Sequence, residues 1–223
     1  MGTKPDKYLK YTPDERLVLG VYREIDNVIK NELEKYRREG IVSTCKAGCY
    51  FCCRQKIPVV IPEAHVLGQY IKRNFSDKQK QELRNRFSNW FDWVRDELPK
   101  YASTPKDEPA AFYNYGPYCP LLVDGKCSTY PARPVACRTC YVSSSPDICR
   151  SDTDIKSVPG DTNILLAIPK AAKPIQMRIR ERVEASGVIL SDAVSLLPHW
   201  VAIEMEWEDL IDKTIQSYTR SDG

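Results

Sequence analysis

The chain has 223 residues, of which 42% are hydrophobic and 28% charged, a composition typical of globular proteins. Its 33 basic and 30 acidic residues leave a net charge of only +3, which gives no support for a nucleic-acid or anionic membrane partner. No stretch approaches the roughly 20 apolar residues of a membrane span, and the polar residues 1–10 lack the apolar segment of a secretory signal. We therefore expect a cytoplasmic protein.

The first predicted element is a long helix over residues 13–39. Thr12 and Glu15 have the spacing of a capping box, and Pro13 suits the first helical position. Gly40 is expected to end the helix, because glycine readily adopts the left-handed conformation found there. Apolar residues recur at helical spacing and predict one buried face, made by Val18, Tyr22, Ile25, Ile29, Leu33 and Tyr36.

The middle of the chain alternates between cysteine-rich and helical segments. A cysteine-rich segment covers residues 41–54, and a short extended stretch over residues 57–61 leads into a helix. Ser76 opens a further helix, because Gln79 stands three residues later and completes a capping box. This helix is predicted to end near Lys100, since several prolines follow.

Residues 110–150 are predicted to be irregular, because five cysteines, five tyrosines and five prolines concentrate there. Helical periodicity returns after Gly160, with a break at Gly187 and a terminal helix that begins near Pro198. The apolar face of this last helix is predicted to consist of Trp200, Ile203, Trp207, Leu210, Ile211 and Ile215.

The pattern predicts a mostly α-helical protein with two irregular cysteine-rich loops that are organised around a metal centre. We divide the chain into an N-terminal helix (residues 1–44), a cysteine-cluster region (residues 45–150) and C-terminal helices (residues 151–223). These parts are expected to form one compact domain, because the chain is short enough for a single core.

Nine cysteines against two histidines are the most informative feature of the composition. An odd number of cysteines in a chain with no export signal argues against a disulfide framework and favours metal binding by thiolates. The first group is Cys45-x3-Cys49-x2-Cys52-Cys53, whose close spacing lets one loop direct several sulfurs at a soft metal. The second group is Cys119-x7-Cys127-x9-Cys137-x2-Cys140-x8-Cys149.

The first group, followed by the segment CPLLVDGKCSTYPARPVACR over residues 119–138, resembles the YkgJ-type cysteine-cluster family. This family is also described as the CxxCxxCC zinc- or iron-chelating domain and includes the flagellin lysine N-methylases. Family members usually carry an apolar residue near Cys140, so the resemblance implies a buried thiol there. The metal ligands that the resemblance implies are Cys45, Cys49, Cys52, Cys53, Cys119, Cys127, Cys137 and Cys149.

His65 and His199 are predicted to be helix residues, which leaves an all-thiolate site for zinc or an iron–sulfur cluster. Zinc would favour two separable sets of four thiolates. The adjacent Cys52 and Cys53 cannot easily point at one ion, but they can serve a larger cluster or two neighbouring sites. We favour a [4Fe–4S] cluster, with zinc as the alternative.

The flagellin methylase relatives imply an enzyme that uses S-adenosylmethionine to transfer a group to a peptide or small molecule. Arg133 and Arg138 flank the second cysteine group and could bind the carboxylate of such a cofactor or donate to cluster sulfur. Alternatively, these guanidinium groups tie irregular loops together through backbone carbonyls. The alternative function is a non-enzymatic zinc module, with a structural role or a role in metal delivery. No catalytic residue is predicted.

Overall fold

The protein is mostly helical in its computed structural model, which describes residues 14–46, 48–145, 149 and 162–211. The α-helices of this part of the chain are α2 (Glu15–Arg38), α3 (Ile61–Asn74), α4 (Asp77–Asp96), α5 (Leu98–Tyr101), α6 (Glu108–Tyr115), α7 (Val135–Arg138), α9 (Thr162–Ala185), α10 (Leu190–Ala193) and α11 (Leu197–Glu204). Short strands accompany them, namely β1 (Pro58–Val60), β2 (Leu122–Val123), β3 (Lys126–Cys127) and β4 (Val194–Leu196).

Helix α2 has the predicted buried face but not the predicted cap. The Asp14 carboxylate caps the helix by accepting a hydrogen bond of 3.0 Å from the amide of Leu17. Glu15, which the capping box would need, instead accepts from the guanidinium of Arg73 in α3 at 2.6 and 2.9 Å. Thr12 lies outside the described residues. The C-terminal end of α2 is as expected, because Gly40 follows the helix with a φ of +80°.

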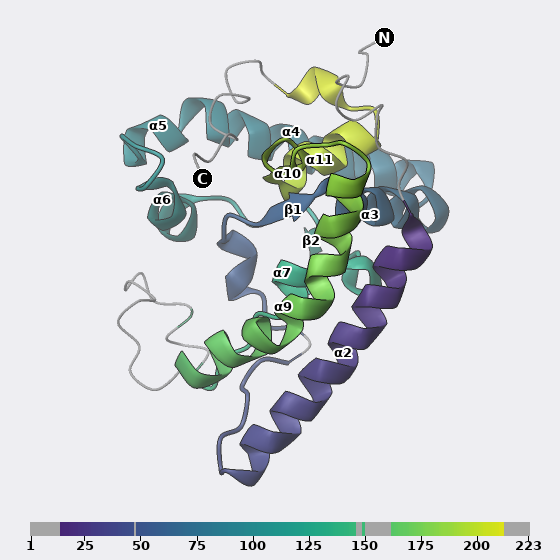
Figure 1. The fold of residues 1–223 in the computed structure, drawn as a ribbon. Coiled ribbons are helices and arrows are strands. Elements are labelled where there is room, and N and C mark those ends of the chain that lie inside the picture. Colours follow the sequence, from purple (N-terminus) through teal and green to yellow (C-terminus); the bar gives the residue numbers. More distant parts are fainter. Residues whose placement is uncertain (1–13, 47, 146–148, 150–161, 212–223) are drawn as a thin grey trace.

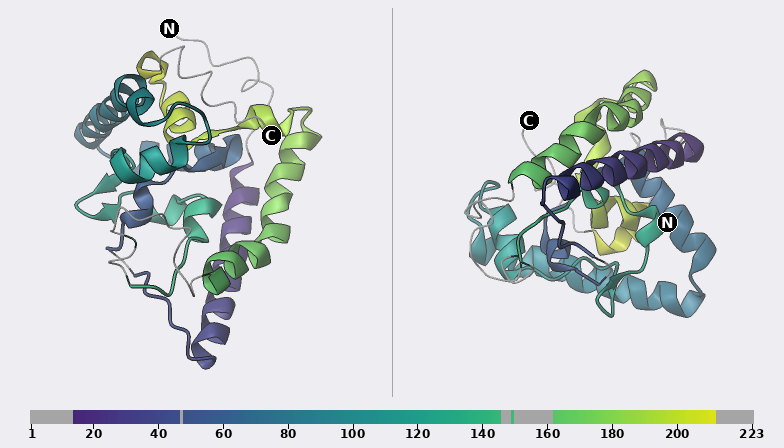
Figure 2. Two further views of the ribbon diagram at one scale, coloured as in Figure 1. Left: turned by 90° about the vertical axis from the view of Figure 1, so that its left-hand side faces the viewer. Right: turned by 90° about the horizontal axis from the view of Figure 1, so that it is seen from below.

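Helices α2 and α9 run side by side in opposite directions along one flank of the molecule (Figures 1 and 2). Both direct apolar side chains into the core, including Val21 and Ile25 from α2 and Ile179 from α9. Helix α9 bends in Figure 1, and two prolines inside it, Pro169 and Pro174, account for the bend. Helical structure after Gly160 and the break at Gly187, whose φ is +79°, are thus confirmed.

Strand β1 confirms the predicted extended stretch, and it pairs antiparallel with β4, which the sequence analysis missed. Val59 lies opposite Ser195 in this pair. The pairing joins segments far apart in the chain, and the helices that follow the two strands, α3 and α11, pack against each other. Each helix follows its strand directly and has a proline in its first turn.

The last predicted helix is shorter than expected. Helix α11 ends at Glu204, and Glu206 has a φ of +62°, so the chain turns sharply instead of continuing the helix. Trp207 nevertheless packs in the core, where its ring lies 5.5 Å from that of Phe87. The prediction failed because an apolar spacing that fits a helix can also come from a helix and a following turn. Ile215 lies outside the described residues.

The capping box of α4 is confirmed, since Ser76 Oγ accepts from the Gln79 amide and Gln79 Oε1 accepts from the Ser76 amide. The predicted single helix to Lys100 is divided at Glu97 into α4 and the short α5. Residues 110–150 are not wholly irregular, because α6 continues to Tyr115. The described residues between Gly116 and Ser145 form short turns, the hairpin of β2 and β3, and single helical turns.

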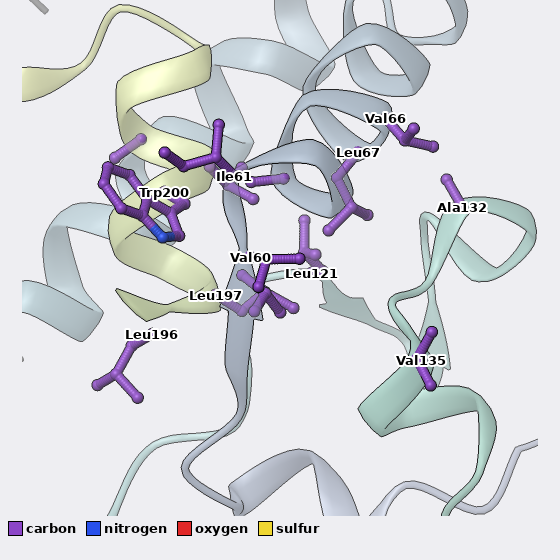
Figure 3. Close-up of a cluster of buried hydrophobic side chains, with 14 of the residues drawn as sticks. Val60, Ile61, Val66, Leu67, Leu121, Ala132, Val135, Leu196, Leu197 and Trp200 are labelled. Atoms are coloured by element: carbon purple, nitrogen blue, oxygen red, sulfur yellow. The ribbon is translucent and has the colours of Figure 1, made fainter. Parts of the chain in front are cut away.

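The buried apolar side chains form one cluster to which β1, α3, α11 and the second cysteine loop all contribute (Figure 3). Members of this cluster drawn in Figure 3 are Val60, Ile61, Val66, Leu67, Leu121, Ala132, Val135, Leu196, Leu197 and Trp200.

No helix in the described part of the chain combines the length and apolar character needed to cross a bilayer.

The contact between α3 and α11 depends on Gly68. A Cβ atom at Gly68 would lie 2.7 Å from Cβ of Glu204, which is buried. We expect Gly68→Ala to lower the free energy of unfolding by ~1–3 kcal/mol, because the helices must separate to admit the methyl group. Gly20→Ala in α2 is the matched control: its Cβ would lie 3.9 Å from a flexible Arg23 side chain, so better helix propensity should stabilise the protein slightly. Urea unfolding measures the free energy of unfolding of both variants. A change of the same sign in the two variants would contradict the packing argument.

Candidate metal centre

A cavity of about 400 Å³ lies between the two cysteine-rich loops. Its walls also include Trp90 from α4, Phe112 from α6 and residues 196–198, where β4 ends and α11 begins. None of the cysteines on its walls forms a disulfide. These cysteines come from both sequence groups and are Cys45, Cys49, Cys52, Cys53, Cys119, Cys127, Cys137 and Cys140.

The first loop is held against the segment that follows Cys140. The amide of Thr44 donates to the carbonyl oxygen of Val142 at 3.0 Å, and the amide of Val142 donates to Cys45 Sγ at 3.4 Å. Gly48, with a φ of +88°, turns the chain back toward the cavity. A 3-10 helix, η1 (Phe51–Arg54), then carries Cys52 and Cys53.

The second loop is attached directly to the first. The amide of Cys119 donates to the carbonyl oxygen of Cys53 at 2.7 Å. The hairpin of β2 and β3 follows, and Asp124 and Gly125 at its tip both have positive φ, as a two-residue hairpin turn requires. Cys127 is paired with Leu122 across this hairpin, so the turn returns its thiol to the cavity.

Helix α7 positions the next two cysteines. The buried carboxylate of Glu63, in α3, accepts a hydrogen bond of 2.7 Å from the amide of Val135 at the start of α7. Burial raises the pKa of this carboxyl group. Cys137 lies in α7, and Cys140 follows two residues after the helix.

The thiols strongly affect one another's ionisation. Hydrogen bonds from the thiols of Cys140 and Cys53 lower the pKa of Cys52 to about 3, and donating these bonds raises the pKa of both donors. Burial raises the pKa of Cys119 to about 12 and that of Cys137 well above its usual range. Further thiols therefore resist ionisation, and a bound cation would offset this cost.

The cavity wall is positively charged. No aspartate or glutamate is among the described residues that line it. One of the cations, Lys56, is paired with the buried Glu108 at 2.6 Å, and Arg54 lies over the ring of Tyr118 at 4.4 Å. A positive wall favours a bound group of net negative charge. The five cations on the wall are Lys46, Arg54, Lys56, Lys126 and Arg133.

The structure separates the two arginines for which the sequence analysis gave the same expectation. Arg133 lines the cavity and stacks on Tyr130, with its guanidinium carbon 4.0 Å from the ring centre. Arg138 does not line the cavity. It is buried and bound to the Asp26 carboxylate at 2.8 Å and to the carbonyl oxygen of Arg133 at 2.8 Å. Its contacts are those of the structural fork that was the alternative interpretation.

Seven of the eight predicted ligands meet at the cavity, and Cys149 does not line it. The carbonyl oxygen of Cys149 accepts a hydrogen bond from the Tyr113 hydroxyl, and most of its neighbours in sequence lie outside the described residues. Cys140 takes the place of the eighth thiol. The sequence signal that could have found it is the Cys137-x2-Cys140 spacing, which repeats the spacing of Cys49 and Cys52.

The two histidines lie in helices, and neither lines the cavity. Nδ1 of His65, in α3, is 3.2 Å from Oε1 of Glu204. His199, in α11, is buried, and its Nδ1 forms a hydrogen bond of 2.8 Å with Ser195 Oγ. The donor atoms around the cavity are therefore sulfurs, as the cysteine-rich composition led us to expect.

The thiols surround the cavity without converging on a single point. Within the described ranges, no three cysteine, histidine, aspartate or glutamate side chains are grouped as one metal ion requires. A tetrahedral zinc with Zn–S bonds of about 2.3 Å needs sulfurs roughly 3.8 Å apart. The ligands of a cubane cluster can lie farther apart, because each binds a different iron. The thiols on the wall are donors of the kind that a thiophilic metal requires.

The described part of the chain is thus a mostly helical protein in which eight thiols line one cavity. No family model, curated protein or solved structure matches the chain. The resemblance to the cysteine-cluster family therefore stays a prediction based on the residues that carry it.

Proposed function

We propose that this protein binds a [4Fe–4S] cluster through cysteine thiolates in the cavity between its two cysteine-rich loops. The observation that carries the proposal is the set of eight cysteines, none in a disulfide, that line one cavity. Iron–sulfur clusters are held by cysteine thiolates, and their stability depends on a shell that limits access of water. Trp90 and Phe112, whose rings stack at 5.7 Å, supply an apolar wall of this kind.

The charges around the cavity support a cluster of net negative charge. A [4Fe–4S] core with four thiolates is an anion, and the described lining contains cations but no carboxylate. Thiolates of this kind persist in a reducing compartment such as the cytoplasm. The bound cluster would supply electron-transfer capacity or a Lewis-acidic iron, while the chain supplies the thiolates, the positive field and the dry wall.

Group transfer from S-adenosylmethionine to a peptide or small molecule is a second candidate function. It is favoured by Arg54 and Arg133, because the Nε atom of each is buried on the cavity wall with no hydrogen-bond partner among the described residues. A guanidinium group with an unused donor can bind a carboxylate such as that of the methyl donor. This chemistry also requires a cluster iron with an open coordination position. Calorimetric titration with S-adenosylmethionine tests the candidate.

Anaerobically purified protein should be brown and contain iron and acid-labile sulfide in equal amounts. Cys49→Ser is expected to lose a large part of this metal, because the thiolate is a direct ligand. Elemental analysis, sulfide determination and visible absorption measure both results, and Cys149→Ser is the matched control that should keep its metal. A colourless protein that contains only zinc would show that the alternative zinc module is the correct interpretation. A protein that binds no metal would overturn both the iron–sulfur proposal and the zinc alternative.

A further inference from the structure

We propose that the eight thiols form two metal centres and not one, each held by four thiolates. The inference rests on the proposed function, because it assumes that the cavity binds a thiophilic metal. The first centre would have the ligands Cys45, Cys49, Cys52 and Cys140, and the second would have Cys53, Cys119, Cys127 and Cys137.

Contacts within the first loop define the first quartet. The amide of Val142 donates to Cys45 Sγ at 3.4 Å, so the segment after Cys140 lies against Cys45. The thiol of Cys140 lies close enough to that of Cys52 to shift its pKa. The tight turn in which the amide of Cys49 donates to the carbonyl oxygen of residue 46 at 2.9 Å keeps Cys49 close to Cys45. These contacts connect the four cysteines along the part of the cavity wall that the first loop and the segment after Cys140 form.

Backbone hydrogen bonds define the second quartet. The amide of Cys119 donates to the carbonyl oxygen of Cys53 at 2.7 Å, and the amide of Leu122 donates to that of Cys119 at 2.9 Å. Leu122 is in turn paired with Cys127 across the hairpin, so three cysteines lie within a few backbone hydrogen bonds of one another. Cys137, in α7, is the remaining thiol on the wall and completes the set by number; its thiol interacts electrostatically with those of Cys119, Cys52 and Cys127.

The boundary between the quartets falls between Cys52 and Cys53. Both lie in the 3-10 helix η1, where successive side chains project about 120° apart. Their side chains consequently point in different directions. Two adjacent cysteines in this geometry suit two neighbouring centres better than one.

Ligand number and charge lead to the same conclusion. A cubane cluster takes four cysteine thiolates, so a single centre would leave four further thiols on the cavity wall with no ligand role. A [4Fe–4S] core or a zinc ion with four thiolates carries a formal charge of about −2. Of the five cations on the wall, Lys56 is paired with Glu108, and the remaining four match the charge of two such centres.

The test compares the metal content of four cysteine variants with that of the unchanged protein, all purified without oxygen. The unchanged protein should contain about eight iron and eight sulfide per chain. Cys49→Ser and Cys127→Ser should each lose about half of both, and the double variant should lose all. Cys149→Ser is the control that keeps the full amount. Circular dichroism on each preparation shows whether the helical content is retained.

The outcomes distinguish this inference from the proposed function. About four iron per chain in the unchanged protein, with complete loss in either single variant, would overturn the two-centre inference and leave the iron–sulfur proposal standing. Two zinc ions per chain, halved in each variant, would support two centres and overturn the iron–sulfur proposal. If the variants fail to fold, the stoichiometry of the unchanged protein decides. Two filled quartets also leave no open iron, so S-adenosylmethionine should not alter the electron paramagnetic resonance signal of the reduced protein.

Discussion

Replacing Arg138 by alanine should lower the free energy of unfolding by ~3 kcal/mol, because its guanidinium group ties the second cysteine loop to α2. The Arg138 side chain is only 6% exposed and is bound to the Asp26 carboxylate. It also donates to the carbonyl oxygens of Arg133 and Pro131 and lies 4.2 Å from the ring centre of Tyr22. The alanine variant leaves both carbonyl oxygens without this donor and removes the contact with the ring.

Two further variants make the Arg138 experiment specific. Arg138→Lys keeps the charge but loses the planar fork, so it should recover only part of the stability. Arg95→Ala is the matched control, because Arg95 forms ion pairs with Asp92 and Asp96 on an exposed surface and should change the urea midpoint little. The metal content of Arg138→Ala should fall as well, since Arg138 fixes the turn that carries Cys137. Equal midpoints for the Arg138 and Arg95 alanine variants would contradict this assignment.

Acid should destabilise the protein through His199. Burial lowers the pKa of this histidine from 6.5 to about 4. Between these two values the unfolded chain binds a proton at His199 that the folded protein does not, so the free energy of unfolding falls as the pH falls. The difference between the two pKa values corresponds to ~3 kcal/mol of the free energy of unfolding, and this amount is fully lost below about pH 4.

His199→Gln isolates this effect, because glutamine is polar but does not titrate. The free energy of unfolding is measured in urea at pH 7.5, 5.5 and 4.5 for both proteins. Between the highest and the lowest pH, the unchanged protein should lose ~3 kcal/mol more than the variant. The comparison cancels other groups, among them Glu63. Burial raises the pKa of Glu63, so its contribution is present in acid and is lost as the pH rises through its folded-state pKa. If the stability difference between the two proteins does not change with pH, His199 has the same pKa in the folded and the unfolded state, and the prediction is wrong.

The helices illustrate what local pattern can and cannot predict. The buried face of α2 and the capping box of α4 depend on residues three or four positions apart, and both were predicted correctly. The pairing of β1 with β4 was missed, because no local signal connects Val59 with Ser195. The early end of α11 was also missed, because Trp207 stays buried after the chain has left the helix, and its spacing therefore still looks helical.

The candidate site likewise has features that the local sequence predicts and features that only the tertiary structure decides. Cysteine number and close spacing are properties of the chain itself, and they were enough to predict that thiols of both cysteine groups gather at one place. That Cys140 and not Cys149 joins the other seven at the cavity, and that Arg133 faces it while Arg138 binds Asp26, followed only from the packed structure. The physical reason is that a side chain's direction in an irregular loop is set by long-range hydrogen bonds, such as that from the Cys119 amide to the Cys53 carbonyl oxygen, and these exist only once the loops have come together.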